Sequence, residues 1–216
     1  GQFITPTPTP SPTGPRPPAP TPTPFDAAVF LATASPRTPT PTPAAPLASY
    51  RNQIVFFSDK EDQPGMWVMN PDGSNRRYLG SAGGLQKQYD ELLQAQTLSP
   101  DGRYRVYATD QQVNSVQIFI QALQKDQYGV ARTRQLTFLS KIAYDPVWSP
   151  DGAHVAFVSQ DRGSDDIWTV QTDGKDLWNR TPNTWEWDKH PSWSPDSQKI
   201  AFWTNREGTK QIYVMD

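Results

Sequence analysis

WSPDGAHVAFV, residues 148–158, is the central copy of a motif that the chain contains three times. The other copies are LSPDGRYRVYA at residues 98–108 and WSPDSQKIAFW at residues 193–203. The motif serines are Ser99, Ser149 and Ser194, so the repeat is 50 and then 45 residues long. A period of this length is typical of four-stranded β-propeller blades.

The turns and the apolar alternation of a unit place its four strands, which we call a to d in chain order. In the central unit, strand a ends at Trp148 and Ser-Pro-Asp-Gly forms a tight turn, because proline and aspartate suit its corners and glycine suits a positive φ. Strands b and c are predicted at Val155–Val158 and Ile167–Val170, and strand d near Leu177–Arg180. We expect the aromatic residues of these strands to be buried between blades: Trp148, Phe157 and Trp168, with Trp193, Phe202 and Tyr213 as their equivalents.

These motifs resemble the TolB-like, or WD40-like, β-propeller repeat. The resemblance rests on WSPDG, VAF, IWTV and TDG within residues 148–174, and on WVMNPDG at residues 67–73. It covers residues 47–216 and implies an all-β fold, a propeller of four-stranded antiparallel blades that follows a Pro/Thr-rich extended tail. The repeat occurs in proteins with very different activities, so it indicates the fold and not the function.

Three departures from the repeat affect the expected ring. Aligning Ser58 with Ser159 places Leu47 where Trp148 stands, so strand a of the first blade is degraded. The last blade reaches Asp216 just after strand c, so we expect its strand d to be missing and its edge to be exposed. About four blades are visible, and we expect the ring to be incomplete or to be completed by another chain. Ser197 replaces the turn glycine, which costs up to about 1 kcal/mol if its φ is positive.

Residues 1–46 form a segment of different composition. The first 50 residues hold 15 of the 23 prolines and none of the 8 tryptophans. Thr-Pro repeats favour polyproline II, so we predict a semi-rigid tether. An apolar island interrupts the repeats at residues 25–33, and we predict that Phe25, Phe30 and Leu31 anchor the tether on another protein chain. The competing interpretation is that the tail packs on its own propeller.

Composition limits the partners and the compartment. The formal net charge is −2, which argues against nucleic acid or an anionic membrane as the main partner. The chain has no cysteine, which excludes disulfides and thiolate metal sites. It has no apolar run of about 18 residues, so we expect no membrane-spanning helix. The chain starts at Gly1 rather than Met, so we expect an upstream signal peptide or membrane anchor and an extracytoplasmic location, periplasmic or at the cell surface.

The sequence lacks the Gly-x-Ser-x-Gly motif of serine hydrolases and the His-Glu-x-x-His motif of zinc proteases. It also lacks the phosphate-loop pattern and the Gly-x-Gly-x-x-Gly pattern of dinucleotide sites. Of the two histidines, His154 is expected on the surface, and His190 either makes a structural hydrogen bond or contacts a ligand. We therefore expect no enzyme activity, no cofactor and no metal.

The candidate binding residues lie in the loop between strand d of one blade and strand a of the next. Trp185, Trp187 and His190 occupy this loop and its end, on the face that the d–a and b–c loops share. The two tryptophans suit stacking on a peptide or a glycan, or alternatively wedge between blades. Tyr89, Leu92 and Leu93 have helical spacing in the long connection at residues 80–96, so a short helix is predicted on the same face.

Three functions fit the sequence. The first is a non-catalytic scaffold that binds other protein chains at the cell surface as a subunit of a larger assembly. The second is the extracytoplasmic sensor domain of a membrane receptor kinase. The third is the propeller of a prolyl-oligopeptidase-like hydrolase.

Overall fold

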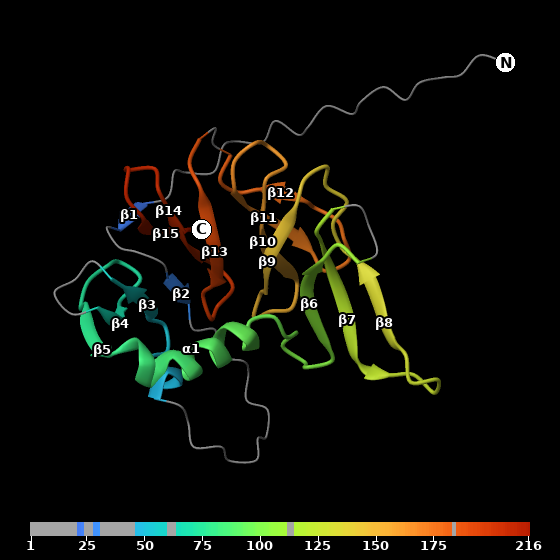
Figure 1. Cartoon of the computed structure of the whole chain (residues 1–216), viewed down its shortest axis with the longest axis horizontal. Helices are drawn as coiled ribbons and strands as arrows, with labels where there is room; N and C mark the ends of the chain where they lie inside the picture. Colours follow the sequence, from blue (N-terminus) through green and yellow to red (C-terminus); the bar gives the residue numbers. More distant parts are fainter. Residues whose placement is uncertain (1–20, 24–27, 31–45, 60–63, 112–114, 183–184) are drawn as a thin grey trace.

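The computed structural model describes residues 21–23, 28–30, 46–59, 64–111, 115–182 and 185–216, and these form four antiparallel sheets that lie side by side (Figure 1). Blade 1 contains β2 (Ala28–Phe30), β3 (Ile54–Ser58), β4 (Gly65–Met69) and β5 (Arg77–Gly80). Blade 2 contains β6 (Tyr104–Thr109), β7 (Gln117–Lys125) and β8 (Ala131–Gln135). Blade 3 contains β9 (Ala143–Trp148), β10 (His154–Ser159), β11 (Asp166–Gln171) and β12 (Trp178–Asn179). Blade 4 contains β13 (Asp188–Trp193), β14 (Ile200–Thr204), β15 (Gln211–Met215) and β1 (Thr21–Thr23).

The predicted all-β propeller fold is confirmed. Strands β9, β10, β11 and β12 pair in that order, and β13, β14 and β15 repeat the pattern. The inner strands are neighbours, since β6 contacts β9, β9 contacts β13 and β13 contacts β2. The blades therefore follow an arc in the order 2, 3, 4, 1 (Figure 1). Blade 2 departs from the pattern, because its strand a is reduced to one bridge between Leu98 and Arg105.

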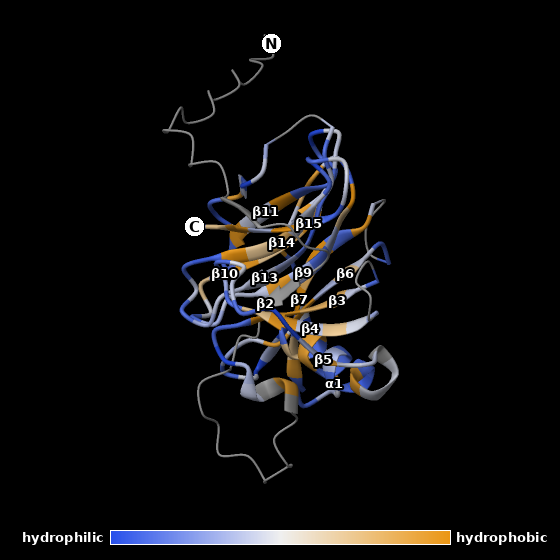
Figure 2. Ribbon diagram, turned by 90° about the vertical axis from the view of Figure 1, so that its left-hand side faces the viewer, coloured by the Kyte–Doolittle hydropathy of each residue, from blue (hydrophilic) through white to orange (hydrophobic). Residues whose placement is uncertain are grey.

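Apolar side chains from neighbouring blades form the core. Val106 and Ile118 of blade 2 pack with Trp148, Phe157 and Trp168 of blade 3. A second cluster joins blade 3 to Trp193, Phe202 and Tyr213 of blade 4, and a third joins blade 4 to blade 1. All six predicted core aromatics are at most 7% exposed, which confirms the strand assignment. Figure 2 shows the apolar residues concentrated along the strands, with hydrophilic residues in the connecting loops.

Side-chain hydrogen bonds hold the Ser-Pro-Asp-Gly turns. In blade 3, Ser149 Oγ donates to Asp151 Oδ1 (2.6 Å) and accepts from the backbone N–H of His154 (2.9 Å). Ser197 takes the glycine position in blade 4 and has φ 62°, so the condition for the expected backbone strain is met. Its hydroxyl accepts a hydrogen bond from the backbone N–H of Asp151 in blade 3 (3.0 Å). This bond between blades offsets part of the strain of a left-handed serine.

Two short strands from the Pro/Thr-rich segment complete the first and last blades. β1 pairs antiparallel with β15, so the expectation that blade 4 lacks strand d is wrong. β2 pairs antiparallel with β3 and supplies strand a of blade 1. Leu47 was expected in that strand but lies in the 3-10 helix η1 (Pro46–Ser49), where it is buried against blade 1. In its described part, the segment therefore packs on its own blades.

The predicted helix is α1 (Ala82–Ala95), which lies across the open side of the arc between blade 1 and blade 2 (Figure 1). Leu85, Tyr89 and Leu92 pack against the cluster of blade 1 that contains Leu47, whereas Leu93 is 38% exposed. The helical spacing predicted for Tyr89 and Leu92 thus corresponds to one packed helix face. Across the part of the chain that the structure describes, no helix is long and apolar enough to span a membrane.

Candidate functional site

The loop between β12 and β13 presents two exposed tryptophans. In an antiparallel meander, the d–a and b–c loops lie on one face of the blades and the a–b and c–d turns lie on the other. Trp185 is 85% exposed and Trp187 is 52% exposed, so neither is wedged between blades. The backbone N–H of Trp187 donates to Asn205 Oδ1 (2.7 Å) in the b–c loop of blade 4. This bond fixes the loop just before β13, and the indole rings of Trp185 and Trp187 remain accessible to solvent.

Two residues with left-handed backbones shape the inner strands of this face. Asp145 in β9 has φ 57° and His190 in β13 has φ 52°, and each precedes a proline. Both lie where the pairing of strand a with strand b shifts register. Aspartate and histidine tolerate this conformation better than most residues, but the position before proline normally excludes it. Each is therefore a strained bulge residue, of the kind that redirects side chains at functional sites.

The two bulges bring a histidine and a carboxylate together across the boundary of blades 3 and 4. His190 Nδ1 lies 2.5 Å from the buried Oδ2 oxygen of Asp145. The His190 ring also lies 6.1 Å from the ring of Trp203. His190 remains about half exposed, so it has a fixed partner on one side and solvent on the other.

Lys189 forms a second contact between these blades. Its Nζ lies 2.8 Å from Asp165 Oδ2 and 5.3 Å from the ring centroid of Trp187. Asp165 also accepts hydrogen bonds from Tyr144 Oη (2.8 Å) and Gln160 Nε2 (2.9 Å). Burial alone would raise the pKa of Asp165, but the hydrogen bonds from Lys189, Tyr144 and Gln160 outweigh burial and lower it. The ammonium group is thus held beneath the exposed indole by an ionised carboxylate.

Buried charges support the loops from beneath. The Asp188 carboxylate is fully buried and lies 3.2 Å from Arg206 Nη2. Asp166 is also fully buried and accepts a hydrogen bond from Asn179 Nδ2 (2.6 Å). Burial, aided by the neighbouring charges of Asp188 and Asp165, raises the pKa of Asp166 to about 6 despite its hydrogen bonds from Asn179 and Ser164. These groups position the loops and have almost no access to a ligand.

A third exposed aromatic residue on this face was missed in the sequence. Phe138 is 78% exposed and lies in the d–a loop between β8 and β9. Thr137 and Thr181 occupy equivalent positions, because their hydroxyls accept hydrogen bonds from the first part of strand c, from Ile118 N and Ile167 N. Aligning the two d–a loops on these threonines would have placed Phe138 on the same face as Trp185.

The other predicted site residues have different surroundings. Phe30 is the last residue of β2 and pairs with Ile54, while Phe25 and Leu31 lie outside the described residues. Contact of these three residues with another chain stays a prediction. The ring of His154 lies 6.3 Å from that of Trp193, next to the a–b turn on the opposite face. Within the described ranges, no group of three or more histidine, aspartate or glutamate side chains is placed to hold a metal ion.

Comparison with solved structures gives several similar chains. A protein described as a TolB from Agrobacterium tumefaciens is 21% identical with a TM-score of 0.46, over 76% of this chain and 57% of that one. TolB from Acinetobacter baumannii is 15% identical with a TM-score of 0.41, over 89% and 43%. An oligogalacturonate lyase in complex with manganese is 21% identical with a TM-score of 0.38, over 76% and 45%. The chain therefore spans about half the length of these structures.

The family is shown by sequence. No curated protein matches the chain. The family model of the TolB beta propeller domain matches residues 86–216, which is more than half of the chain and includes all three Ser-Pro-Asp copies. The chain belongs to the TolB beta propeller domain family.

Proposed function

We propose that the chain is a non-catalytic, extracytoplasmic interaction module that binds a segment of another protein on the face of its d–a and b–c loops. The observation that carries this proposal is the presence of three exposed aromatic side chains on that face, Phe138, Trp185 and Trp187. Large aromatic side chains are the residues that most often dominate the affinity of protein interfaces. We call these three residues the aromatic rim.

Lys189 and His190, which follow Trp187 in the chain, suit recognition of polar groups in the same partner. Lys189 is held by Asp165, and His190 is held by Asp145. Because carboxylates on blade 3 lie against both side chains, a partner meets polar groups whose positions are set in advance. Such preorganisation lowers the entropy lost on binding. The rim supplies most of the apolar contact area, and covering one exposed tryptophan contributes about 2–3 kcal/mol at about 25 cal/mol per Å².

The test uses partner capture in the cell that makes the protein. The full chain carries an affinity tag, and proteins bound to it are quantified by mass spectrometry after crosslinking. A variant with Phe138→Ser, Trp185→Ser and Trp187→Ser is expected to lose the partner. The matched control is Tyr128→Ser, because Tyr128 is 80% exposed but lies in the β7–β8 turn on the opposite face.

The outcomes separate the candidate functions. Loss of one protein partner from the rim variant, with retention by the Tyr128→Ser control, supports the proposal. Equal capture by both variants contradicts it. Loss of binding to a purified glycan, with no change in protein capture, would instead assign the rim to a sugar ligand.

A further inference from the structure

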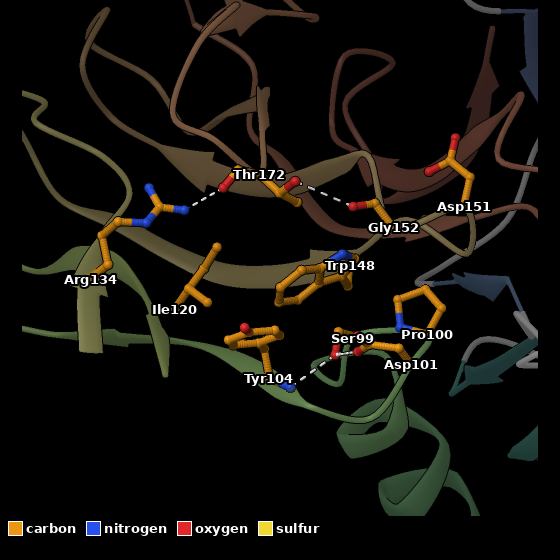
Figure 3. Close-up of a pocket in the computed structure, with 10 residues that line it drawn as sticks. All are labelled: Ser99, Pro100, Asp101, Tyr104, Ile120, Arg134, Trp148, Asp151, Gly152 and Thr172. Carbon is orange, nitrogen blue, oxygen red and sulfur yellow. Dashed lines mark hydrogen bonds between the residues drawn. The ribbon is translucent and has the colours of Figure 1, made fainter. Parts of the chain in front are cut away.

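A cavity of about 480 Å³ opens on the opposite face of the molecule, between blade 2 and blade 3 (Figure 3). It lies beside the a–b turns of both blades and the c–d turn of blade 3, so it is separate from the aromatic rim. Its apolar lining includes Tyr104, Ile120 and Trp148, and Pro100 lies at one end. Tyr104 is 42% exposed and Trp148 is 7% exposed, so one ring faces solvent and the other forms an inner wall. We call this cavity the aromatic slot.

The repeats allow the slot to be compared with the next blade boundary. Tyr104 and Trp148 of the slot are equivalent to His154 and Trp193 at the boundary of blades 3 and 4. There, the His154 ring lies 6.3 Å from Trp193, and the Ser197 side chain bonds to the Asp151 backbone. At the slot, the position of Ser197 is taken by Gly152, which has φ 79° and no side chain. The atoms nearest to an added Cβ would belong to Pro100, at 3.7 Å.

The slot has the shape and chemistry of a site for a ring-containing, extended ligand. Figure 3 shows the Trp148 and Tyr104 side chains on its two sides, with Ile120 toward one end and Pro100 toward the other. Arg134 donates a hydrogen bond to the Thr172 carbonyl and so joins the two blades beside the slot. The carboxylates of Asp101 and Asp151 lie near the Pro100 end. Proline-rich segments dock in grooves with aromatic walls. Their polyproline II backbone is already extended before binding, so little conformational entropy is lost.

We propose that the aromatic slot binds the Thr-Pro segment of the same chain, residues 1–20. This segment contains 8 prolines, and its sequence from Thr5 to Pro10 alternates threonine with proline. It has no aspartate or glutamate and one arginine, Arg16. A cationic, proline-rich segment complements a slot that has aromatic walls and two carboxylates at one end. Threonine adds hydroxyl groups that can donate to those carboxylates.

The segment is long enough to reach the slot. Thr21 is held on blade 4 by the pairing of β1 with β15. Twenty residues of polyproline II span about 62 Å at about 3.1 Å per residue. A compact domain of about 170 residues is on the order of 40 Å across. The segment therefore reaches either face of the propeller from Thr21.

The experiment uses photo-crosslinking in the full chain. Tyr104→p-benzoylphenylalanine places a crosslinker in the slot, and His154→p-benzoylphenylalanine places one at the equivalent position of the next boundary, where the native His154 ring lies 6.3 Å from Trp193. The expected result is a crosslink from position 104 to a peptide within residues 1–20, in protein that runs as a monomer. Position 154 is expected to give no such crosslink.

Two further variants test the cause of that crosslink. Gly152→Ser in the position-104 chain introduces the hydroxyl that Ser197 supplies at the next boundary, and it is expected to lower the crosslink several-fold by narrowing the slot. Pro6→Ser, Pro8→Ser and Pro10→Ser are expected to do the same without altering any residue of the blades. The proposal is overturned if position 104 crosslinks only to its neighbours in the blades, if the product is a dimer, or if the tail variant retains the full yield.

Discussion

Asp166 offers a direct test of the electrostatics beneath the aromatic rim. It is the first residue of β11, is fully buried, and accepts hydrogen bonds from Asn179 Nδ2 (2.6 Å) and Ser164 Oγ (3.2 Å). Its pKa is raised to about 6, mainly by burial. The pKa in the unfolded chain is about 3.9, so between about pH 4 and pH 6 the folded state binds more protons than the unfolded state. The free energy of unfolding should therefore fall as the pH rises through this window.

The size of the effect follows from the two pKa values. A difference of about two pKa units corresponds to at most about 3 kcal/mol, and the effective dielectric response of the protein around the carboxylate reduces this to about 1–2 kcal/mol. Asp166→Asn removes the charge, while its amide oxygen can still accept from Asn179 and its amide nitrogen can donate to Ser164. We expect this variant to be more stable than the native chain by about 1–2 kcal/mol at pH 7.5 and nearly equal to it at pH 4.

Urea unfolding followed by tryptophan fluorescence at pH 4, 5.5 and 7.5 measures both stabilities. Asp173→Asn is the control, since hydrogen bonds from Lys175 lower the pKa of this exposed carboxyl and its charge is favourable in the folded state. The control should therefore show no gain in stability at pH 7.5. The reasoning would be refuted if Asp166→Asn were less stable than the native chain at pH 7.5 by an amount that does not change toward pH 4.

Three further substitutions test the packing. Trp148→Ala should lower the free energy of unfolding by roughly 3–5 kcal/mol because it opens a cavity between blades 2 and 3, and a loss under about 1 kcal/mol in urea unfolding would contradict the strand assignment. Ser197→Gly should change the free energy of unfolding by less than about 1 kcal/mol, because relief of backbone strain offsets the lost hydrogen bond from the Asp151 N–H. Ser197→Ala loses the same bond and keeps the strain, so thermal melting should show it to be the less stable of the two variants. Arg206→Met leaves the Asp188 carboxylate buried without its ion pair and should lower the free energy of unfolding by about 3–5 kcal/mol. Adding Asp188→Asn removes the unpaired charge and should restore part of this stability. No recovery in the double variant would argue against the ion pair.

The blades were predictable where local chemistry determines the chain direction. Each Ser-Pro-Asp-Gly turn reverses the chain within four residues and starts an alternating strand, so β9–β11 and β13–β15 follow from short windows of sequence. β1 and β2 could not be found in this way. Their three-residue lengths show no alternation, and β1 contains Pro22. An edge strand and polyproline II are both extended, so amino-acid composition does not distinguish the two conformations. Pairing with β15 and β3, which are distant in sequence, makes these two segments strands.

The site was predictable for residues whose type is unusual in a loop. Trp185 and Trp187 could be placed in the exposed d–a loop from the sequence alone, whereas their contact with a partner stays a prediction. Asp145 was missed because its role depends on lying next to His190 on another blade. Both residues stand three positions before the tryptophan that ends strand a, so aligning the repeats places them on adjacent inner strands. Their left-handed backbones, however, are set by the bulges and have no signal in residue type alone.

The two strands from the Pro/Thr-rich segment also bear on how such a molecule can change over generations. β1 and β2 complete the last and the first blade, and neither belongs to a Ser-Pro-Asp-Gly repeat. Each repeat contacts mainly its neighbours, so duplicating or deleting one whole repeat between blades 1 and 4 would alter only the boundary at the point of change. The partners of β1 and β2 would still be β15 and β3. Gene duplication could therefore vary the number of blades, and with it the extent of the face that carries the d–a and b–c loops, while β1 and β2 still join blades 4 and 1.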